Sequence, residues 1–342
     1  MPPHCALRST VHDEIDEDPP LSRAMRSRFA AVPALFYGAC ACAATLIAPG
    51  TFLVEGEATP NRQPDCNSIL IEAPRGLIVF DTGRHQEHTQ QLLNFARLQG
   101  RPIAAIINSH WHLDHIGGNP QLRAAFPDLQ VYASDAINAA RAGFLADYRA
   151  QLATEIANAA KKPDAQAALR SEMALIDAGA ALGPTETVMA SHPMTIAGRP
   201  LRVYLESHAV TAGDVWVFDP ETRLLLAGDL VTLPAPFFES ACPSRWQASL
   251  AHLDKTPFER LVPGHGAPMR RQQFTAYRQA FSKLLACAGG NASKADCVDG
   301  WIGDAAALID SKDVSYARTL IDYYLTNYLR NPSERIRKFC TD

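Results

Sequence analysis

Residues 110–118 read HWHLDHIGG, and this stretch decides the fold. It follows an apolar run at residues 103–107 that has the character of a buried strand. Four side chains that can bind a metal fall within six positions: His110, His112, Asp114 and His115. Imidazole nitrogens suit zinc, and a carboxylate oxygen can complete a mixed coordination shell. The pattern therefore predicts a metal site in a loop that leaves a strand; the competing interpretation is a solvated polar loop.

Strand and helix patterns alternate on both sides of this stretch. Turn residues separate the apolar runs, and the hairpin closed by Pro74-Arg75-Gly76 ends at Asp81-Thr82-Gly83. This alternation indicates an α/β layered domain. Strands are expected at residues 51–54, 68–73, 77–80, 103–107 and 129–133, with a helix at residues 88–99.

The character changes after residue 135. Residues 136–182 are rich in Ala, Leu, Glu, Lys and Gln and break near Lys162-Pro163-Asp164, which predicts an inserted helical hairpin. Strand patterns then resume, and a mainly helical tail runs from residue 272 to residue 342. The later strands are expected at residues 201–205, 215–218, 224–227 and 261–262, with a helix at residues 245–253.

Four motifs together resemble the metallo-β-lactamase superfamily in residue type, order and approximate spacing. They are Asp81-Thr82-Gly83, HWHLDHIGG, Gly228-Asp229 and Pro263-Gly264-His265-Gly266. The resemblance covers roughly residues 45–280 and implies an α/β fold, the four-layer αββα sandwich. A helical insertion at about residues 136–182 and a helical C-terminal extension at residues 281–342 would be additions to it.

The resemblance also implies a ligand set and one or two zinc ions per chain. His110 and His112 would bind the first zinc, Asp114, His115 and His265 the second, and Asp229 would bridge the two. Asp81 would order the ligand loop without binding metal. Asp114 is in addition the expected catalytic residue, because a carboxylate near the reacting water can manage its proton.

One position departs from the family pattern. Where relatives usually place a third imidazole for the first zinc, this chain reads Val210-Thr211-Ala212-Gly213-Asp214. His208 lies two residues earlier, on the same face of a strand but about 6.5 Å further back. A local bulge would let His208 reach the metal. Otherwise the first site is depleted, or only the second zinc binds tightly.

The function implied by the resemblance is hydrolysis of a small-molecule ester, thioester, lactone or amide by a metal-bound hydroxide. Asp229 favours this reading, because β-lactamases of this fold commonly carry Cys or Ser there. Two alternatives stay open: a class B-like β-lactamase, and a non-catalytic metal- or ligand-binding protein with a depleted first site. Residues 234–238 (PAPFF) are expected either to form an apolar wall of the substrate cleft or to be ordinary core.

Composition limits the other possibilities. With 342 residues, of which 47% are hydrophobic, the chain can bury a full core in one large or two modest domains. A net charge of −4 and the lack of a dense basic run argue against nucleic acid as a partner. The sequence does not indicate an oligomeric state.

Residues 1–44 are expected to be a disordered leader followed by a signal peptide. An acidic, Pro-bearing segment precedes Met25-Arg26-Ser27-Arg28, an apolar stretch and small-residue cleavage patterns. Translation is expected to begin at Met25 and the product to be periplasmic or secreted, with no stable membrane span after leader removal. A buried or membrane-anchoring helix is the alternative.

Five cysteines follow the leader. Cys287 and Cys297 flank a loop that a disulfide can close, which an oxidising compartment would preserve. An odd number leaves at least one free thiol; the alternative is five buried, reduced cysteines.

Overall fold

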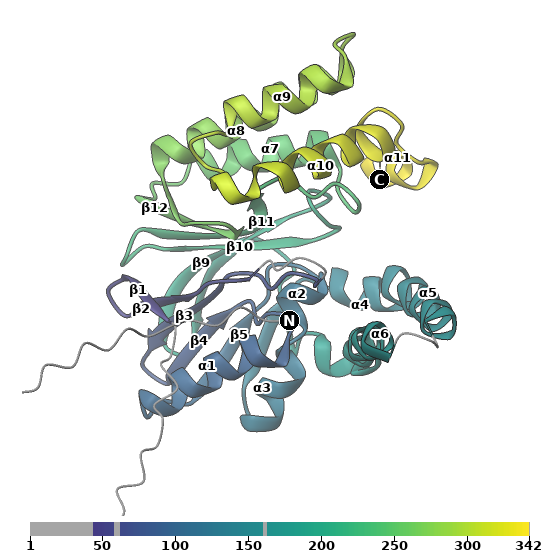
Figure 1. Cartoon of the computed structure of the whole chain (residues 1–342). Helices are drawn as coiled ribbons and strands as arrows, with labels where there is room; N and C mark the ends of the chain where they lie inside the picture. The colour runs from purple at the N-terminus through teal and green to yellow at the C-terminus, as the bar shows by residue number, and fades with distance from the viewer. Residues whose placement is uncertain (1–43, 58–61, 160–162, 342) are drawn as a thin grey trace, which may run out of the picture. The chain divides into compact units, whose positions relative to one another are not determined.

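The structure is a computed structural model that describes residues 44–57, 62–159 and 163–341. The expected leader therefore lies outside the described residues, except for Ala44. Within them the chain forms two β-sheets (Figure 1). The first contains, in spatial order, β1 (Thr45–Ala48), β2 (Thr51–Val54), β3 (Ser68–Ala73), β4 (Gly76–Phe80), β5 (Ile103–Ile107), β6 (Gln130–Ala133) and β7 (Glu186–Thr187). The second contains β13 (Met269–Arg270), β12 (Arg260–His265), β11 (Leu224–Thr232), β10 (Asp214–Asp219), β9 (Arg199–Glu206) and β8 (His192–Ile196).

The strand directions explain where polar side chains meet. In the first sheet β4, β5 and β6 run parallel to one another, and in the second sheet β11 runs parallel to β12. The carboxyl ends of parallel strands lie at one edge of a sheet, where ligand-binding loops commonly gather. Asp81 follows β4 and His110 follows β5, so the sequence motifs emerge at a shared edge.

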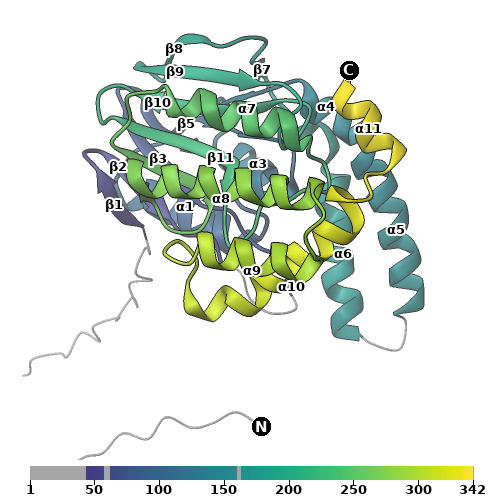
Figure 2. The same ribbon diagram turned by 90° about the horizontal axis from the view of Figure 1, so that it is seen from above.

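Alternation along β4 shows how the layers form. Ile78 and Phe80 pack in the core between the two sheets, whereas Leu77 and Val79 face the opposite side and pack beneath helix α1. A strand buried on both faces needs such a continuous apolar run. The outer helices of the first sheet are α1 (Gln86–Leu98) and α3 (Asn119–Ala125), and those of the second are α7 (Pro243–Asp254) and α8 (Arg271–Gly289) (Figures 1 and 2). The α/β fold of helix, sheet, sheet and helix expected from the sequence is confirmed.

Two groups of helices lie outside this sandwich. The first packs on the loop that carries Trp111 and comprises α4 (Ala136–Ala142), α5 (Phe144–Asn158), α6 (Pro163–Asp177) and the short η1 (Gly179–Leu182). The second follows α8 and comprises α9 (Lys294–Asp304), η2 (Ser311–Asp313), α10 (Val314–Tyr324), η3 (Leu325–Leu329) and α11 (Glu334–Thr341). Among the helices of the described residues, none combines the length and apolar character needed to cross a bilayer.

Two disulfides hold the C-terminal helices. Cys287–Cys297 joins α8 to α9, which confirms that expectation, and Cys242–Cys340 ties α11 to the residue before α7. Of the cysteines in the described part of the chain, Cys66 is the one without a disulfide partner, and it is buried.

The strands that the sequence did not predict lie at sheet edges. β8 has mainly exposed side chains, and β7 and β13 contain two residues each. Short edge strands carry little apolar alternation, because only part of one face is buried.

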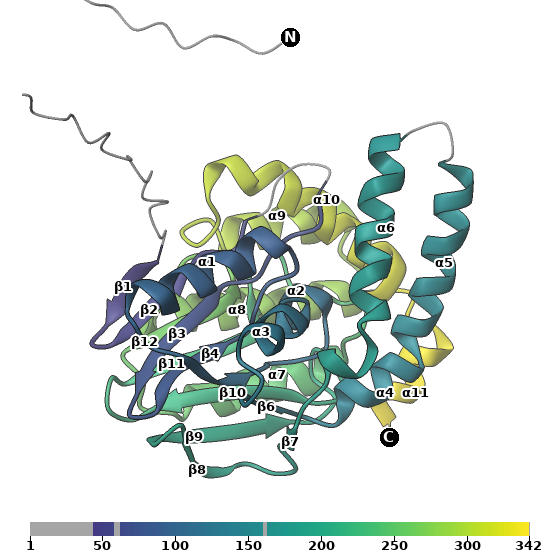
Figure 3. The ribbon, with the colours of Figure 1, turned by 90° about the horizontal axis from the view of Figure 1, so that it is seen from below.

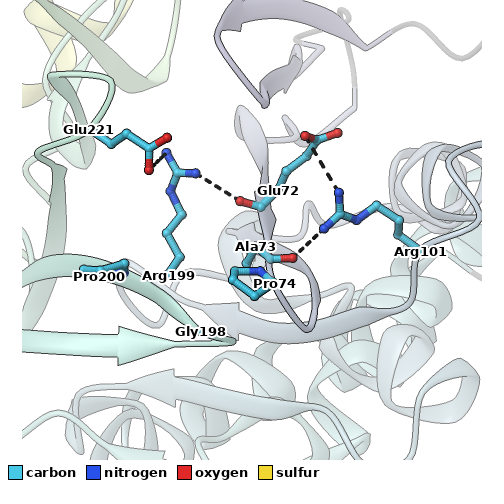
Figure 4. Close-up of a pocket in the computed structure, with 8 residues that line it drawn as sticks. All are labelled: Glu72, Ala73, Pro74, Arg101, Gly198, Arg199, Pro200 and Glu221. Carbon is cyan, nitrogen blue, oxygen red and sulfur yellow. Dashed lines mark hydrogen bonds and ion pairs between the residues drawn. The ribbon is translucent and has the colours of Figure 1, made fainter.

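The two sheets are also joined at the end opposite to Asp81. There Arg199 donates a hydrogen bond to the Asp219 carboxylate at 2.6 Å. It donates a second one to the Glu72 carbonyl oxygen at 3.1 Å (Figure 4). A pocket of about 390 Å³ opens beside it, next to the β3–β4 turn. Its charged side chains pair with one another, Glu72 with Arg101 and Glu221 with Arg199. We therefore regard this pocket as part of the junction between the sheets.

Candidate metal centre

The motif residues converge at the edge where the parallel strands end. Asp114 and His115 lie in the short helix α2 (Leu113–Ile116), Asp229 lies in β11, and His265 ends β12. Among the described residues, three groups have ligand atoms within 4.8 Å of one another. One of them, Cys66, Asp81 and His115, is fully buried behind the loop. The other two groups are His110, His115 and Asp229, and Asp114, His115 and His265.

The local backbone brings these side chains close. Asp81 has a φ of 58°, a left-handed conformation that non-glycine residues rarely adopt and that clusters at functional sites. Gly264 lies against Asp229, and a Cβ at this position would collide with the Asp229 Oδ1 atom. Asn67 donates hydrogen bonds to the carbonyl oxygens of Pro263 and Gly266, which fixes the turn that presents His265.

Asp229 faces three imidazoles. Its Oδ1 lies 3.4 Å from His115 Nε2 and 3.7 Å from His265 Nε2, and its Oδ2 lies 3.9 Å from His110 Nε2. The Asp114 Oδ2 atom lies 2.9 Å from His265 Nε2. A carboxylate with one oxygen toward each group of nitrogens is suited to bridge two cations.

Hydrogen bonds away from the cluster fix the protons of two imidazoles. The Ser109 hydroxyl donates to Asp81, so it accepts from His110 Nδ1 at 2.9 Å and leaves Nε2 without a proton. The Ser240 hydroxyl donates to the Val210 carbonyl, so it accepts from His112 Nε2 at 2.8 Å and leaves Nδ1 without a proton.

The two unprotonated nitrogens, His110 Nε2 and His112 Nδ1, then lie only 2.8 Å apart. Two lone pairs at this distance repel each other, whereas a cation bound by both would stabilise the arrangement.

The His115 ring is also oriented by a hydrogen bond from one of its nitrogens. Its Nδ1 donates to Asp81 Oδ2 at 2.8 Å, which directs the Nε2 atom into the cluster. Both His115 Nε2 and Asp229 Oδ1 are buried without a hydrogen-bond partner among the described residues. Buried polar atoms in proteins are nearly always satisfied, so these two fit a metal ion as their partner. The donor set of imidazole and carboxylate suits zinc.

The charges of the cluster agree with this fit. Burial lowers the pKa of His110 well below its usual value and that of His112 to about 4, so both rings stay neutral and able to bind metal.

Burial acts against a charge on His115 and His265 as well, but the acidic side chains around them, among them Asp229 and Asp114, raise both pKa values above the usual one. Burial also acts against a charge on Asp114, but His115, His265 and Arg84 hold its pKa well below the usual value. Asp114 is therefore ionised, and a bound cation would take the place of the protons on His115 and His265.

A family model described as the metallo-beta-lactamase superfamily matches residues 62–265. The chain belongs to this superfamily. The resemblance drawn from the four motifs is confirmed, because the match contains every residue of them except Gly266.

Relatives in the superfamily differ in what their names describe. The chain is 27% identical over 223 residues to a linear primary-alkylsulfatase of Pseudomonas sp., which is 58% of this chain and 41% of the relative. It is 47% identical over 45 residues to a hydroxyacylglutathione hydrolase of Crocosphaera subtropica, covering 13% of this chain and 18% of the relative. The chain thus spans less than half the length of these curated relatives.

Solved structures share the fold at low identity. A metallo-β-lactamase from Pontibacter korlensis matches 70% of this chain and 98% of its own, at 19% identity and a TM-score of 0.52. The metallo-β-lactamase FIM-1 from Pseudomonas aeruginosa, in its mono-zinc form, matches 70% and 94% at 16% identity and a TM-score of 0.53.

The superfamily position that usually holds a third imidazole is filled differently here. The structure does not bring His208 to the groups of candidate ligands found among the described residues. His208 has a φ of 59°, and its ring packs on Phe339 of α11 with the centroids 4.8 Å apart. Its assignment as a ligand stays a prediction. Ser240, which the sequence analysis did not single out, contacts His112 instead.

The two phenylalanines of the apolar segment at residues 234–238 lie in different surroundings. The Phe237 ring packs on His112 with the centroids 5.0 Å apart and on Tyr324 of α10 at 5.9 Å. Phe238 is fully buried against Trp246 and Phe281. One phenylalanine therefore borders the metal centre, and the other belongs to the core.

Proposed function

We propose that the chain is a zinc-dependent hydrolase of small ester-like substrates. The ligands would be His110, His112, Asp114, His115, Asp229 and His265. The observation that carries this proposal is a pair of buried atoms without a hydrogen-bond partner among the described residues, His115 Nε2 and Asp229 Oδ1, which face each other at 3.4 Å inside the candidate cluster.

When bound, zinc would act as a Lewis acid on the substrate oxygen and lower the pKa of a water molecule toward neutrality. The chain's own residues orient the reaction. Asp81 and Ser109 hold the rings of His115 and His110 at fixed angles, and Ser240 does the same for His112. Asp114 lies beside His265 at the proposed metal site, so we assign to its carboxylate the reception of the proton from the attacking water.

The two zinc sites that these ligands would form differ in how many candidate ligands converge on them. Asp114, His115 and His265 converge with Asp229. By contrast, His112 belongs to none of the groups of candidate ligands found among the described residues, and its Nε2 contacts Ser240. We therefore propose that the site of Asp114, His115 and His265 binds zinc more tightly, with one or two ions per chain.

The surroundings favour a substrate with an apolar part. The Phe237 ring packs on His112 and on Tyr324. Trp111 packs on His112 as well and on Phe144 of the insertion, with the centroids of the latter pair 4.9 Å apart. Such aromatic walls bury apolar groups of a ligand while a few polar atoms fix its orientation.

Among ester-like substrates, carboxylic esters, thioesters and sulfate esters come first. The alkylsulfatase and the hydroxyacylglutathione hydrolase support this choice, because their names describe cleavage of such bonds. Hydrolysis of β-lactams is supported by the solved structures only through the shared fold.

We also propose that the protein is exported. The two disulfides among the described residues support an oxidising compartment, since such bonds are rare in the reducing cytosol.

A substrate panel tests the proposal. Zinc-loaded protein is assayed with a p-nitrophenyl ester, an acylated glutathione, an alkyl sulfate and nitrocefin, beside the His265→Ala and Asp229→Ala variants. We expect turnover of at least one of the first three substrates and a loss of 100-fold or more in both variants. Turnover of nitrocefin alone would favour the β-lactamase, and turnover unchanged by both replacements would refute the proposed centre.

A further inference from the structure

A buried arginine connects the metal centre to the helical insertion. Arg84 follows the Asp81-Thr82-Gly83 motif, and its side chain is only 10% exposed. Its Nη2 lies 3.5 Å from Asp114 Oδ1, and its Nη1 donates a hydrogen bond to Glu172 Oε1 on α6. The guanidinium thus lies between a proposed zinc ligand and a residue 88 positions away in the sequence.

This arrangement is built into the interior. Glu172 is 11% exposed, and Tyr148 of α5 donates a hydrogen bond to the same Oε1 atom at 3.3 Å. Burial and the charge of Glu172 raise the pKa of Tyr148 to about 12, so its hydroxyl keeps the proton that it donates. Buried charges are costly unless paired, and the rigid planar guanidinium can donate to two carboxylates in fixed directions.

Asp114 is held from two sides. Its Oδ2 contacts His265, and its Oδ1 faces Arg84. Without Glu172, the full charge of Arg84 would be directed at Asp114 and would compete with a metal ion for the carboxylate. With Glu172 present, the guanidinium of Arg84 is shared between the two carboxylates and keeps Asp114 oriented.

We propose that Arg84 is a positioning residue for Asp114 and that Glu172 couples the helical insertion to the metal centre. The position in which α6 packs then influences the affinity for the metal. By thermodynamic reciprocity, metal binding stabilises α6 in that position. Figure 3 shows α6 beside the end of the sandwich that carries α2. This inference rests on the proposed function, because it takes Asp114 as a metal ligand.

The chain offers a matched control. Arg149 and Asp177 join the same two helices, α5 and α6, through an exposed ion pair with a nitrogen–oxygen distance of 2.5 Å. Asp177→Asn removes a carboxylate from α6 without touching Asp114. Glu172→Gln removes one that contacts Arg84 and preserves the shape of the side chain.

The test measures zinc affinity by competition with a chelator, the visible absorption of cobalt-loaded protein, and hydrogen exchange of α6 with and without zinc. The full chain is used as wild type, Glu172→Gln, Asp177→Asn and His265→Ala. We expect Glu172→Gln to lower zinc affinity about tenfold, as outer partners of metal ligands commonly do, and to shift the cobalt spectrum. Asp177→Asn should match the wild type in both, and zinc should slow exchange in α6 of the wild type but much less in Glu172→Gln.

The outcomes separate the two claims. Equal zinc affinities and spectra for Glu172→Gln and Asp177→Asn, with a clear loss in His265→Ala, would overturn the coupling and leave the proposed function standing. A wild-type chain that binds no metal, or a His265→Ala variant that binds as well as the wild type, would overturn both.

Discussion

Replacing Asp81 by Asn tests how the chain prepares its imidazoles. Asp81 is fully buried and accepts hydrogen bonds from the Ser109 backbone and hydroxyl, each at 2.7 Å, and from His115 Nδ1 at 2.8 Å. Asn has nearly the same shape and tolerates the φ of 58° well, so the backbone can stay in place. The change therefore acts on proton positions rather than on packing.

The magnitude follows from these contacts. If the Asn oxygen keeps the Ser109 amide, its NH₂ group faces the hydroxyl and His115 Nδ1, and two hydrogen bonds to a charged group are lost. Each is worth about 1.5–3 kcal/mol, but burial raises the pKa of Asp81, so removing a buried charge offsets part of the loss. We expect the free energy of unfolding of the metal-free chain to fall by about 3 kcal/mol.

Metal affinity should fall as well. The Asn NH₂ group opposes a proton on His115 Nδ1 and favours one on Nε2, the nitrogen that faces Asp229. Zinc must then displace that proton, and loss of such an orienting partner commonly lowers affinity 10–100-fold.

Chelator competition and thermal unfolding provide the assay. Asp219→Asn is the control, because Asp219 is a buried carboxylate that binds Arg199 and Thr222 outside the metal centre. The control should lose stability but keep its zinc affinity within twofold. An Asp81→Asn variant that binds zinc as tightly as the control would refute the reasoning.

Three further predictions concern other parts of the chain. His208→Ala should leave zinc affinity within twofold, because its ring packs on Phe339; a tenfold loss in chelator competition would return His208 to the ligand set. Removing zinc with a chelator should lower the Tm by roughly 5 °C, since a ligand at 100 times its Kd contributes about 2.7 kcal/mol, and an unchanged Tm by calorimetry would contradict specific binding. The paired change Cys287→Ser and Cys297→Ser should reduce the free energy of unfolding by about 3 kcal/mol in denaturant titrations, as expected for a short closed loop. An unaltered transition midpoint would show that the disulfide does not form in the protein.

Much of the fold could be predicted because its signals are local. The apolar strand at residues 103–107, the turn at residues 74–76 and the helix break near Pro163 each follow from residue types within a few positions. The four motifs also identified most of the candidate ligands, because each motif is a short run of characteristic residues. Edge strands such as β8 were missed, since their exposed side chains give little periodic signal.

Contacts between distant segments could not be predicted in the same way. Glu172 is one of many charged residues in a helical pattern, and only the folded chain places it against Arg84. Ser240 lies 128 residues from His112, and Cys242 lies 98 residues from Cys340. No rule of spacing connects such pairs, because they depend on how the insertion and the C-terminal helices dock.

His208 illustrates a limit of reasoning from strand geometry. Its position two residues before Val210 suggested a shared face, but β9 ends at Glu206 and the chain turns through a left-handed residue at His208 itself. Alternation applies only while the strand continues. The ring is consequently directed to Phe339 rather than held by strand register.

Elemental analysis of the purified full chain, after dialysis against a weak chelator, tests the central claim most directly. We expect at least one retained zinc per chain, and its loss when Asp114 and His265 are both replaced by Ala in a protein that still folds. A folded double variant with the same zinc content as the unaltered chain would contradict it.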